Sequence, residues 1–253
     1  MDTSLSAVGY CYNIVNYGKE CQRILNGIYT CYTLMLKDNV LVPFNDENEI
    51  RNILLRDYLN NDMVRNQTDL IWYTFNKEVP EENGRVDIKV EFRNHLIPVK
   101  AYYIIECKRL DSENLKGVTG LNAKYIENGI YRFVSKLYPT NCGINAMIGF
   151  VVEAMDIRSN VENNINFLLK NSFTNCNTTK VLHKESFIPG YEFHFVSEHN
   201  DIDNVSFTLY HLMFDFSKNI ISDKSQCPLS AIYCLCTTHM KGFDCSHTGK
   251  INT

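Results

Sequence analysis

The chain of 253 residues lacks the marks of several large protein classes. No apolar run is long enough to span a membrane, and the polar N-terminus has no basic region followed by an apolar one, as a secretory signal would. There is no glycine-rich phosphate loop, no dinucleotide-binding fingerprint, no Gly-x-Ser-x-Gly element and no internal repeat. We therefore expect a cytoplasmic protein without membrane segments, and the enzyme classes that carry those motifs have little support.

Positive charge is not in excess either, since 25 Lys and Arg face 29 Asp and Glu and the net charge is −4. Proteins that hold nucleic acid through many phosphate contacts are usually basic. The charge balance argues against tight nonspecific binding over a large surface, but it leaves room for a local basic patch. Five basic side chains do gather in one part of the sequence: Lys89, Arg93, Lys100, Lys108 and Arg109.

The chain has ten cysteines but no secretory signal, so we expect reduced thiols rather than a disulfide framework. Three cysteines recur in an apparently helical, apolar stretch and are expected to be buried as small apolar side chains: Cys11, Cys21 and Cys31. Six soft or imidazole ligands crowd the C-terminal tail: Cys227, Cys234, Cys236, His239, Cys245 and His247. Their spacings match structural zinc sites poorly, so we expect an apolar strand with incidental cysteines and keep zinc as the alternative.

Length and composition fit one large α/β domain with appendages. Hydrophobic residues make up 45% and charged residues 21% of the chain, which is ordinary for a folded globular protein and allows a substantial core. We expect an N-terminal helical segment over residues 1–44 that packs on the core, a central domain over 45–220 and a C-terminal extension over 221–253.

The most informative residues lie on two short apolar segments. Asp87 follows a turn and opens one apolar strand, and Glu106 and Lys108 lie one residue apart at the end of another. Because side chains alternate along a strand, Glu106 and Lys108 point to the same side while Cys107 points into the core. If the two strands are neighbours, Asp87, Glu106 and Lys108 converge on one patch. Two carboxylates suit a hard cation such as Mg²⁺, and a nearby lysine can orient or deprotonate a metal-bound water.

This pattern resembles the PD-(D/E)xK nuclease superfamily, whose restriction-endonuclease-like fold occurs in many type II restriction endonucleases. Val86 stands where that motif has proline, a departure that removes no ligand. The resemblance implies that Asp87 and Glu106 hold Mg²⁺, for which Mn²⁺ can substitute, and that the backbone carbonyl of Cys107 completes the metal shell. It also implies that Lys108 acts on the attacking water.

The flanking pattern agrees with this resemblance. Apolar periodicity and turn chemistry predict a helix, an antiparallel hairpin of two strands, a third strand, a second helix and a fourth strand, over residues 46–59, 69–79, 85–92, 99–106, 121–137 and 144–153. This order is the αβββαβ core of the superfamily, in which helices flank a mixed central sheet. The resemblance covers roughly residues 45 to 155, under half of the chain.

The two predicted helices of this core carry further candidates. Related nucleases commonly place a glutamate of the first helix at the metal, and Glu49, next to Ile50 of the apolar stripe, is our first choice, with Glu47 as the second. The alternative is that both glutamates only complement the helix dipole. Lys124 and Arg132 on the second helix are candidate contacts for a substrate phosphate, and the alternative is that both are solvated surface charges.

The rest of the chain carries no specific motif. We predict a helix, a loop, a strand and a turn over residues 157–170, 171–179, 191–196 and 197–201. A strand that enters a helix near His211 is expected over residues 205–216, and His211 is expected to be a packed core histidine rather than a ligand. The spacing of His183, His194 and His199 supports no metal site.

Together these expectations describe a Mg²⁺-dependent phosphodiester hydrolase that acts on DNA rather than RNA, as an endonuclease in restriction, repair or phage defence. The acidic balance and the missing proline keep a second interpretation open, namely a catalytically silent nuclease-fold module that binds nucleic acid or protein. The apolar segment 5–37 either packs on its own core or serves as a helix for homodimer formation, which would bring two sites to two scissile phosphates.

Overall fold

The computed structural model describes residues 14–81, 84–93 and 102–221. The chain divides into two units, Met1–Ile220 and Ile221–Thr253, and only Ile221 of the second unit is among the described residues. Cys11 and the Cys/His cluster of the tail lie outside them, so the expectations for these residues stay predictions. Within the described ranges, no helix combines the length and the apolar character needed to cross a membrane.

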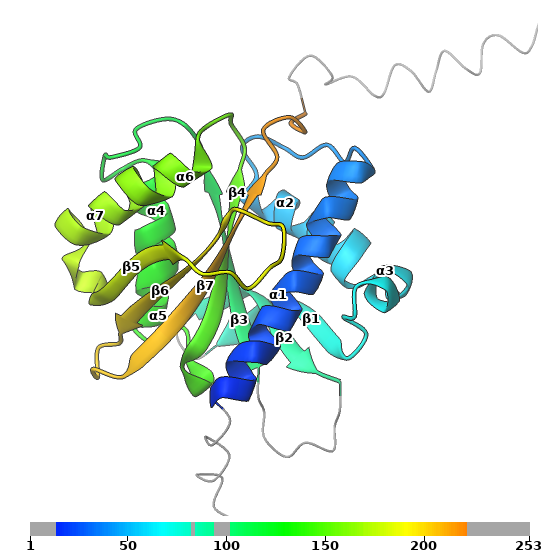
Figure 1. Ribbon diagram of the computed structural model, residues 1–253, viewed down its shortest axis with the longest axis horizontal. Helices are drawn as coiled ribbons and strands as arrows, with labels where there is room; N and C mark the ends of the chain where they lie inside the picture. Colours follow the sequence, from blue (N-terminus) through cyan, green and yellow to red (C-terminus); the bar gives the residue numbers. More distant parts are fainter. Residues whose placement is uncertain (1–13, 82–83, 94–101, 222–253) are drawn as a thin grey trace, which may run out of the picture. The chain divides into compact units, whose positions relative to one another are not determined.

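The first unit is built on a seven-stranded mixed sheet (Figure 1). Its strands are β1 (Tyr73–Glu81), β2 (Gly84–Phe92), β3 (Tyr102–Leu110), β4 (Ile144–Val151), β5 (Thr178–Lys184), β6 (His194–Asn200) and β7 (Ser206–Asp215). They lie in the order β1-β2-β3-β4-β7-β6-β5. The central strands β3, β4 and β7 are parallel, and the outer pairs are antiparallel. The predicted α/β class with a mixed central sheet is confirmed.

Helices cover both faces of this sheet (Figure 1). One face carries α1 (Ile14–Lys37), α2 (Glu47–Ile53) with its π-helical continuation η2 (Leu54–Leu59), and α3 (Asp62–Gln67). The other face carries α4 (Leu121–Tyr125), η3 (Ile126–Ile130), α5 (Tyr131–Val134), α6 (Ile157–Asn160), η5 (Val161–Ile165) and α7 (Asn166–Asn171). Two short 3₁₀ turns, η4 (Asn141–Gly143) and η6 (Thr174–Cys176), precede β4 and β5.

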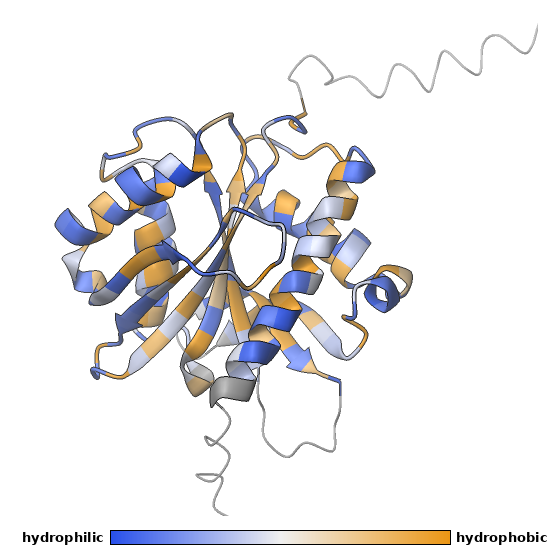
Figure 2. Cartoon of the chain, in the orientation of Figure 1, coloured by the Kyte–Doolittle hydropathy of each residue, from blue (hydrophilic) through white to orange (hydrophobic). Residues whose placement is uncertain are grey.

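Each face of the sheet buries its own apolar core. Strand β4 is buried along its whole length, and it gives Ile148 to the core under α1 and Met147 to the core under α4 to α7. We call these the α1-side core and the α4-side core. Figure 2 shows apolar residues concentrated along the central strands, between the two helical layers. A strand that is buried on both faces is expected to be continuously apolar, as the segment around Ile148 is.

The N-terminal helix α1 belongs to the first unit rather than standing apart from it. Its buried residues recur every three or four positions and lie in the α1-side core: Cys21, Ile24, Leu25, Ile28, Cys31, Tyr32 and Met35. This spacing places them on one face of a helix. The expected burial of Cys21 and Cys31 is confirmed. Packing on its own core was the first of the two interpretations of this segment; a homodimer is untested.

Three predictions for the second half of the chain are wrong. The edge strand β5 begins at Thr178, inside the loop that we expected to reach residue 179, and β6 continues through the expected turn to Asn200. The segment around His211 stays extended in β7 and does not enter a helix. The run 205–216 is apolar or aromatic at eight of its twelve positions, as suits a strand that lies between β4 and β6 and is buried on both faces. A run of this kind has no periodicity that separates strand from helix.

Candidate functional site

Asp87 lies where the ladder between β2 and β3 ends. The last registered pair of that ladder is Ile88 with Ile105, and beyond it the Asp87 carboxylate takes over, since its Oδ2 accepts a hydrogen bond from the Cys107 backbone N–H at 2.9 Å. Ile88 is in the α1-side core, but Val86, two residues away, is in the α4-side core. Side chains two positions apart on a regular strand share a face. The face therefore switches at Asp87, and its carboxylate emerges between the strands.

The neighbouring strand is irregular at the same level. Glu78 on β1 has a φ of 51°, and the registered pairs on either side of it, Lys77 with Ile88 and Val79 with Val86, skip Glu78 and Asp87. A non-glycine residue at positive φ is uncommon and costs free energy, so it persists only where the surroundings enforce it. The ladder keeps the same register on both sides, so the unpaired step is a local opening at which Glu78 and Asp87 lie opposite each other.

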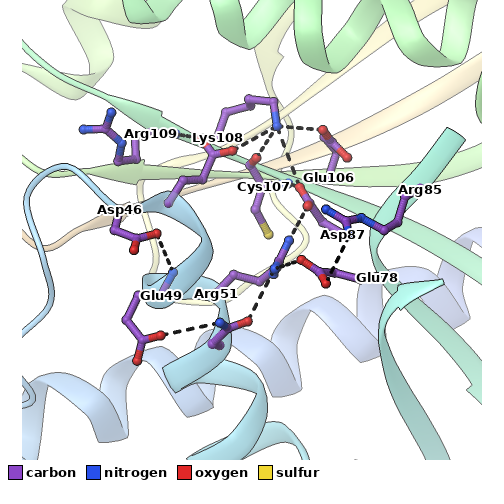
Figure 3. Close-up of polar contacts among 12 residues, drawn as sticks. Asp46, Glu49, Arg51, Glu78, Arg85, Asp87, Glu106, Cys107, Lys108 and Arg109 are labelled. Carbon is purple, nitrogen blue, oxygen red and sulfur yellow. Dashed lines mark hydrogen bonds and ion pairs between the residues drawn. The ribbon is translucent and has the colours of Figure 1, made fainter. Parts of the chain in front are cut away.

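Glu106 and Lys108 meet Asp87 at this opening (Figure 3). The Lys108 Nζ lies 2.6 Å from Glu106 Oε1, 3.7 Å from Asp87 Oδ2, and 2.6 Å from the backbone carbonyl of Cys107, to which it donates a hydrogen bond. The Cys107 side chain is buried in the α1-side core. The structure therefore brings together Asp87, Glu106, Lys108 and the Cys107 carbonyl, and we call this group the carboxylate–lysine site.

Helix α2 adds an acid to this site, and that acid is Glu47. Its Oε1 lies 3.1 Å from Lys108 Nζ, and its Oε2 accepts a hydrogen bond from the Arg109 backbone N–H at 2.7 Å. Glu49, our first choice, is 44% exposed and faces Arg56 at 4.0 Å. The helix begins at Glu47 after the N-cap Asp46. Two residues further along, Glu49 is turned about 200° around the helix axis and cannot face the sheet.

Sequence reasoning missed Arg51, which α2 also turns toward the site. Its side chain is 2% exposed, with Nη1 2.5 Å from Asp87 Oδ1 and Nη2 2.8 Å from Glu78 Oε1. Glu47 and Arg51 lie four residues apart, so they share one face of the helix. The sequence carries a signal for this, because Arg51 follows Ile50 within the apolar stripe and a charge in that position needs a buried partner.

The far side of the site opens into a pocket of about 430 Å³. Four cations and two acids line it together with Leu121 and three amides: Lys108, Arg109, Lys124, Arg132, Asp46, Glu47, Asn45, Asn48 and Asn128. Arg132 donates from Nη1 to Glu106 Oε1 at 3.0 Å and to the Tyr138 hydroxyl. The amine of Lys124 makes no ion pair or side-chain hydrogen bond with any described residue. Both residues predicted for phosphate contact thus line this pocket.

Burial and charge shift the acid–base properties of the site. Burial, together with the nearby Asp87 carboxylate, raises the pKa of Glu106 to about 7 even though Lys108 and Arg132 act to lower it. Burial acts to lower the pKa of Lys108, but the carboxylates of Glu106, Asp87 and Glu47 outweigh it and hold that pKa above its usual value. The lysine is therefore an ammonium in the metal-free protein.

The donor set fits a hard divalent cation. Glu106 Oε2 is buried and has no hydrogen-bond partner among the described residues, so one carboxylate oxygen of the site is available. Among those residues, no group of three or more His, Cys, Asp or Glu side chains is arranged to hold a metal. Asp87, Glu106 and the Cys107 carbonyl instead supply two carboxylates and one backbone oxygen. Mg²⁺ commonly binds to one or two carboxylates and completes its shell with waters and substrate phosphate.

A second buried polar network, which shares no residue with this site, holds two of the histidines. The His211 ring accepts or donates at both nitrogens, to the Tyr125 hydroxyl at 2.7 Å and to the Ser197 hydroxyl at 2.8 Å. Ser197 also bonds His199 Nε2 at 2.7 Å, and His199 Nδ1 lies 3.1 Å from the Cys176 carbonyl. Burial lowers the pKa of His199 to about 4 and that of His211 well below its usual value. The expectation that His211 is a packed core histidine is confirmed.

No protein-family model matches the chain, and searches of the curated proteins and of the solved structures gave no significant match.

Proposed function

We propose that the chain is a Mg²⁺-dependent nuclease that hydrolyses phosphodiester bonds of DNA, with Mn²⁺ as a substitute cation and a restriction-endonuclease-like αβββαβ core formed by α2, β1, β2, β3, α4 to α5 and β4. The observation that supports it most is the convergence of Asp87, Glu106, Lys108 and the Cys107 carbonyl at the point where β2 and β3 separate. These residues are about twenty positions apart in sequence, and each belongs to the motif that resembles that superfamily.

In this proposal Asp87, Glu106 and the Cys107 carbonyl hold the cation, which supplies a polarised water and neutralises charge on the scissile phosphate. The Lys108 ammonium lies between the carboxylates of Glu106 and Asp87, where it orients the attacking water and stabilises the negative charge that builds on the phosphate. Glu47 holds Lys108 from the helical side and keeps its amine pointed at the site. Glu47, our second choice on this helix, is thus the glutamate of α2 that reaches the site, where it contacts Lys108.

The substrate phosphates would lie in the adjoining pocket. Its lining carries four cations against two acids in a protein whose net charge is −4. Both acids are engaged, since Asp46 caps α2 and Glu47 bonds Lys108 and the Arg109 backbone. Lys124, which has no such partner among the described residues, can therefore attract an anion, and Arg132 can offer the nitrogens that Glu106 and Tyr138 do not engage. A strand of DNA fits this local positive charge without requiring a basic protein surface.

A second candidate function is a nuclease-fold module that binds nucleic acid or protein without catalysis. One observation favours it, the ion pair between Arg51 and Asp87. The Arg51 guanidinium already neutralises the carboxylate that a metal ion would neutralise in a working site. A retired site, however, has no need to keep Glu106 and Lys108 buried beside it, and burial of unused charges is destabilising.

The deciding experiment incubates purified full-length protein with single- and double-stranded DNA and with RNA, in Mg²⁺, in Mn²⁺ and in EDTA. We expect cleavage of DNA that needs the divalent cation and disappears in Asp87→Ala. Absence of cleavage on every substrate, with a cooperatively melting protein that still binds nucleic acid, would support the silent module instead. Products with both strands cut, together with a dimer in light scattering, would support the homodimer.

A further inference from the structure

Arg51 is a buried cation that the mechanism above does not use. One edge of its guanidinium pairs with Asp87 Oδ1 at 2.5 Å and the other with Glu78 Oε1 at 2.8 Å (Figure 3). The second oxygen of Asp87 already accepts from the Cys107 backbone N–H. Arg51 therefore holds an oxygen of the very carboxylate that the proposed function gives to a divalent cation.

A buried guanidinium cannot give up a carboxylate unless another one remains. Removing one partner of a buried ion pair leaves an uncompensated charge, which is strongly destabilising. Glu78 is that other partner, because it accepts from Nη2 of Arg51 while Asp87 accepts from Nη1. Arg85 also lies 3.5 Å from Glu78, but its side chain is 63% exposed and can turn to solvent.

The backbone conformation of Glu78 is an independent reason to assign a function to the contact between Glu78 and Arg51. Glu78 has a φ of 51° and lies opposite Asp87, at a step that the otherwise unshifted β1–β2 ladder leaves unpaired. Strain of this kind concentrates at functional sites and is kept where it places a side chain. Here the irregular residue is the one whose carboxylate meets Arg51.

We infer that Arg51 is the internal counter-cation of the site, which neutralises Asp87 in the metal-free protein and passes to Glu78 when a divalent cation binds Asp87. Arg51 then competes with the cation for one oxygen, and Glu78 favours the cation by retaining Arg51. Both are positioning residues that act through Asp87. The inference rests on the proposed function, since it requires Asp87 to be a metal ligand.

The two residues should change cation affinity in opposite directions. Arg51→Gln removes the competitor and should tighten Mn²⁺ binding by roughly fivefold or more, the effect of about 1 kcal/mol. Glu78→Gln leaves Arg51 with Asp87 alone and should weaken Mn²⁺ binding by a similar factor. Isothermal titration calorimetry with Mn²⁺ and without nucleic acid measures both. A role in stability alone would weaken binding in both variants.

Two control variants test whether Arg51 acts by direct contact with Asp87, rather than through its charge or through the stability of the fold. Arg85→Gln removes a positive charge close to Glu78 without touching Asp87, so it should leave Mn²⁺ affinity within about twofold of wild type, the small effect of an exposed charge. Arg65→Gln removes another buried arginine, on α3 and away from the site, and should lower the melting temperature without changing Mn²⁺ affinity. If Arg85→Gln tightens binding as much as Arg51→Gln does, the inference is wrong.

The remaining outcomes also support or overturn the inference, and they separate it from the proposed function. If Arg51→Gln does not fold, Glu78→Gln decides together with its melting temperature: weaker Mn²⁺ binding at an unchanged melting temperature supports the inference, and any other result overturns it, since Glu78 is 27% exposed and its replacement is tolerable. If wild type cleaves DNA but Arg51→Gln binds Mn²⁺ more weakly, the inference fails and the proposed function stands. If wild type binds no Mn²⁺ and Arg51→Gln does, the inference stands while the proposed function fails. Binding by neither protein overturns the inference, and the cleavage assay judges the function separately.

Discussion

Glu106 on β3 and His211 on β7 both pair in register with Met147 of β4, so the two side chains lie on the same face of the sheet with one apolar residue between them. Glu106 belongs to the carboxylate–lysine site, whose members are charged and which opens into a pocket. His211 belongs to the network with Ser197, His199 and Tyr125, whose members are neutral and enclosed. The fold thus places two buried polar networks side by side with opposite electrostatic character.

The difference between them separates a candidate site from a structural network. In the histidine network both ring nitrogens of His199 and of His211 have partners, and burial keeps both rings neutral. In the carboxylate–lysine site Glu106 keeps an oxygen without a partner among the described residues, and its pKa is raised to about 7. Both networks bury polar groups. Of the two, the carboxylate–lysine site has a buried oxygen without a partner among the described residues and opens into a pocket, which makes it the candidate functional site.

The largest effects are expected from substitutions in the carboxylate–lysine site. Asp87→Ala should abolish Mn²⁺ binding and DNA cleavage together, because it removes a ligand. Lys108→Ala should lower cleavage by roughly a hundredfold or more, the usual scale for a positioned charge-stabilising group, while Mn²⁺ still binds. Because it removes a buried ammonium from beside three carboxylates, it should also lower the melting temperature, so cleavage is compared at a temperature at which the variant is folded. Cleavage rates and calorimetric Mn²⁺ titration of each variant check this.

Lys136→Ala is the matched control for Lys108→Ala. Lys136 also pairs with a carboxylate, Asp203, at 2.5 Å, but both side chains are largely exposed. Its loss should change neither cleavage nor Mn²⁺ affinity. Equal losses in the two lysine variants would break the assignment of Lys108.

The histidine network should respond in the opposite way. Ser197→Ala removes the hydroxyl between His199 Nε2 and His211 Nε2 and leaves two buried nitrogens without a partner. We expect a loss of about 1–3 kcal/mol in the free energy of unfolding with the cleavage rate of the folded protein unchanged. Urea denaturation and cleavage assays measure the two quantities. Ser159→Ala, on the partly exposed start of α6, should cost less than about 0.5 kcal/mol.

The two networks should also give stability opposite dependences on pH in the metal-free protein. The pKa of His199 falls from 6.5 unfolded to about 4 folded, so the unfolded chain binds more protons between these values and stability is lost as the pH falls through that window. The pKa of Glu106 rises from 4.5 to about 7, so the folded chain binds more protons and this group's contribution is lost as the pH rises through its window. Each group changes the slope by at most roughly 1.4 kcal/mol per pH unit.

Variants resolve these opposing slopes. Between pH 5 and 6.5, His199→Gln should make the unfolding free energy rise less steeply with pH, and Glu106→Gln should make it rise more steeply. Urea titrations in EDTA at several pH values measure both slopes. A steeper slope in His199→Gln would contradict a neutral, enclosed histidine.

The carboxylate–lysine site could be predicted from the sequence better than the histidine network. Asp87, Glu106 and Lys108 were found because chemistry restricts which residues occupy such a motif, and strand alternation then gives their direction. It was harder to predict which glutamate of α2 reaches the site, since a small difference in where the helix begins decides whether Glu47 or Glu49 faces the sheet. Helix ends are the least certain part of any prediction from periodicity.

The other failures have tertiary causes. The place of Arg51 within the apolar stripe signals a buried partner, but only the fold shows that its partners are Asp87 and Glu78. The network around Ser197 joins residues on four elements, and nothing local marks Ser197 or His199 as partners, so this stretch looked like a turn. Strand β5 is an edge strand whose burial does not alternate, and its threonines also suit a loop. In each case long-range contacts outweigh local propensity.

The smallest expected effect concerns the entrance to the charged network. Lys124 lines the pocket beside Lys108 and is exposed, and its amine has no partner among the described residues, so it can contribute one phosphate contact. Lys124→Ala should weaken DNA binding in Ca²⁺ or EDTA only a few-fold, and it should reduce the slope of log affinity against log salt by about 1, as the loss of one contact does. Lys170→Ala, an exposed lysine on α7, should leave that slope unchanged. Fluorescence anisotropy at several salt concentrations measures both. If the two variants show equal slopes, the pocket does not face the DNA, and Lys108 would have to meet its phosphate from another direction.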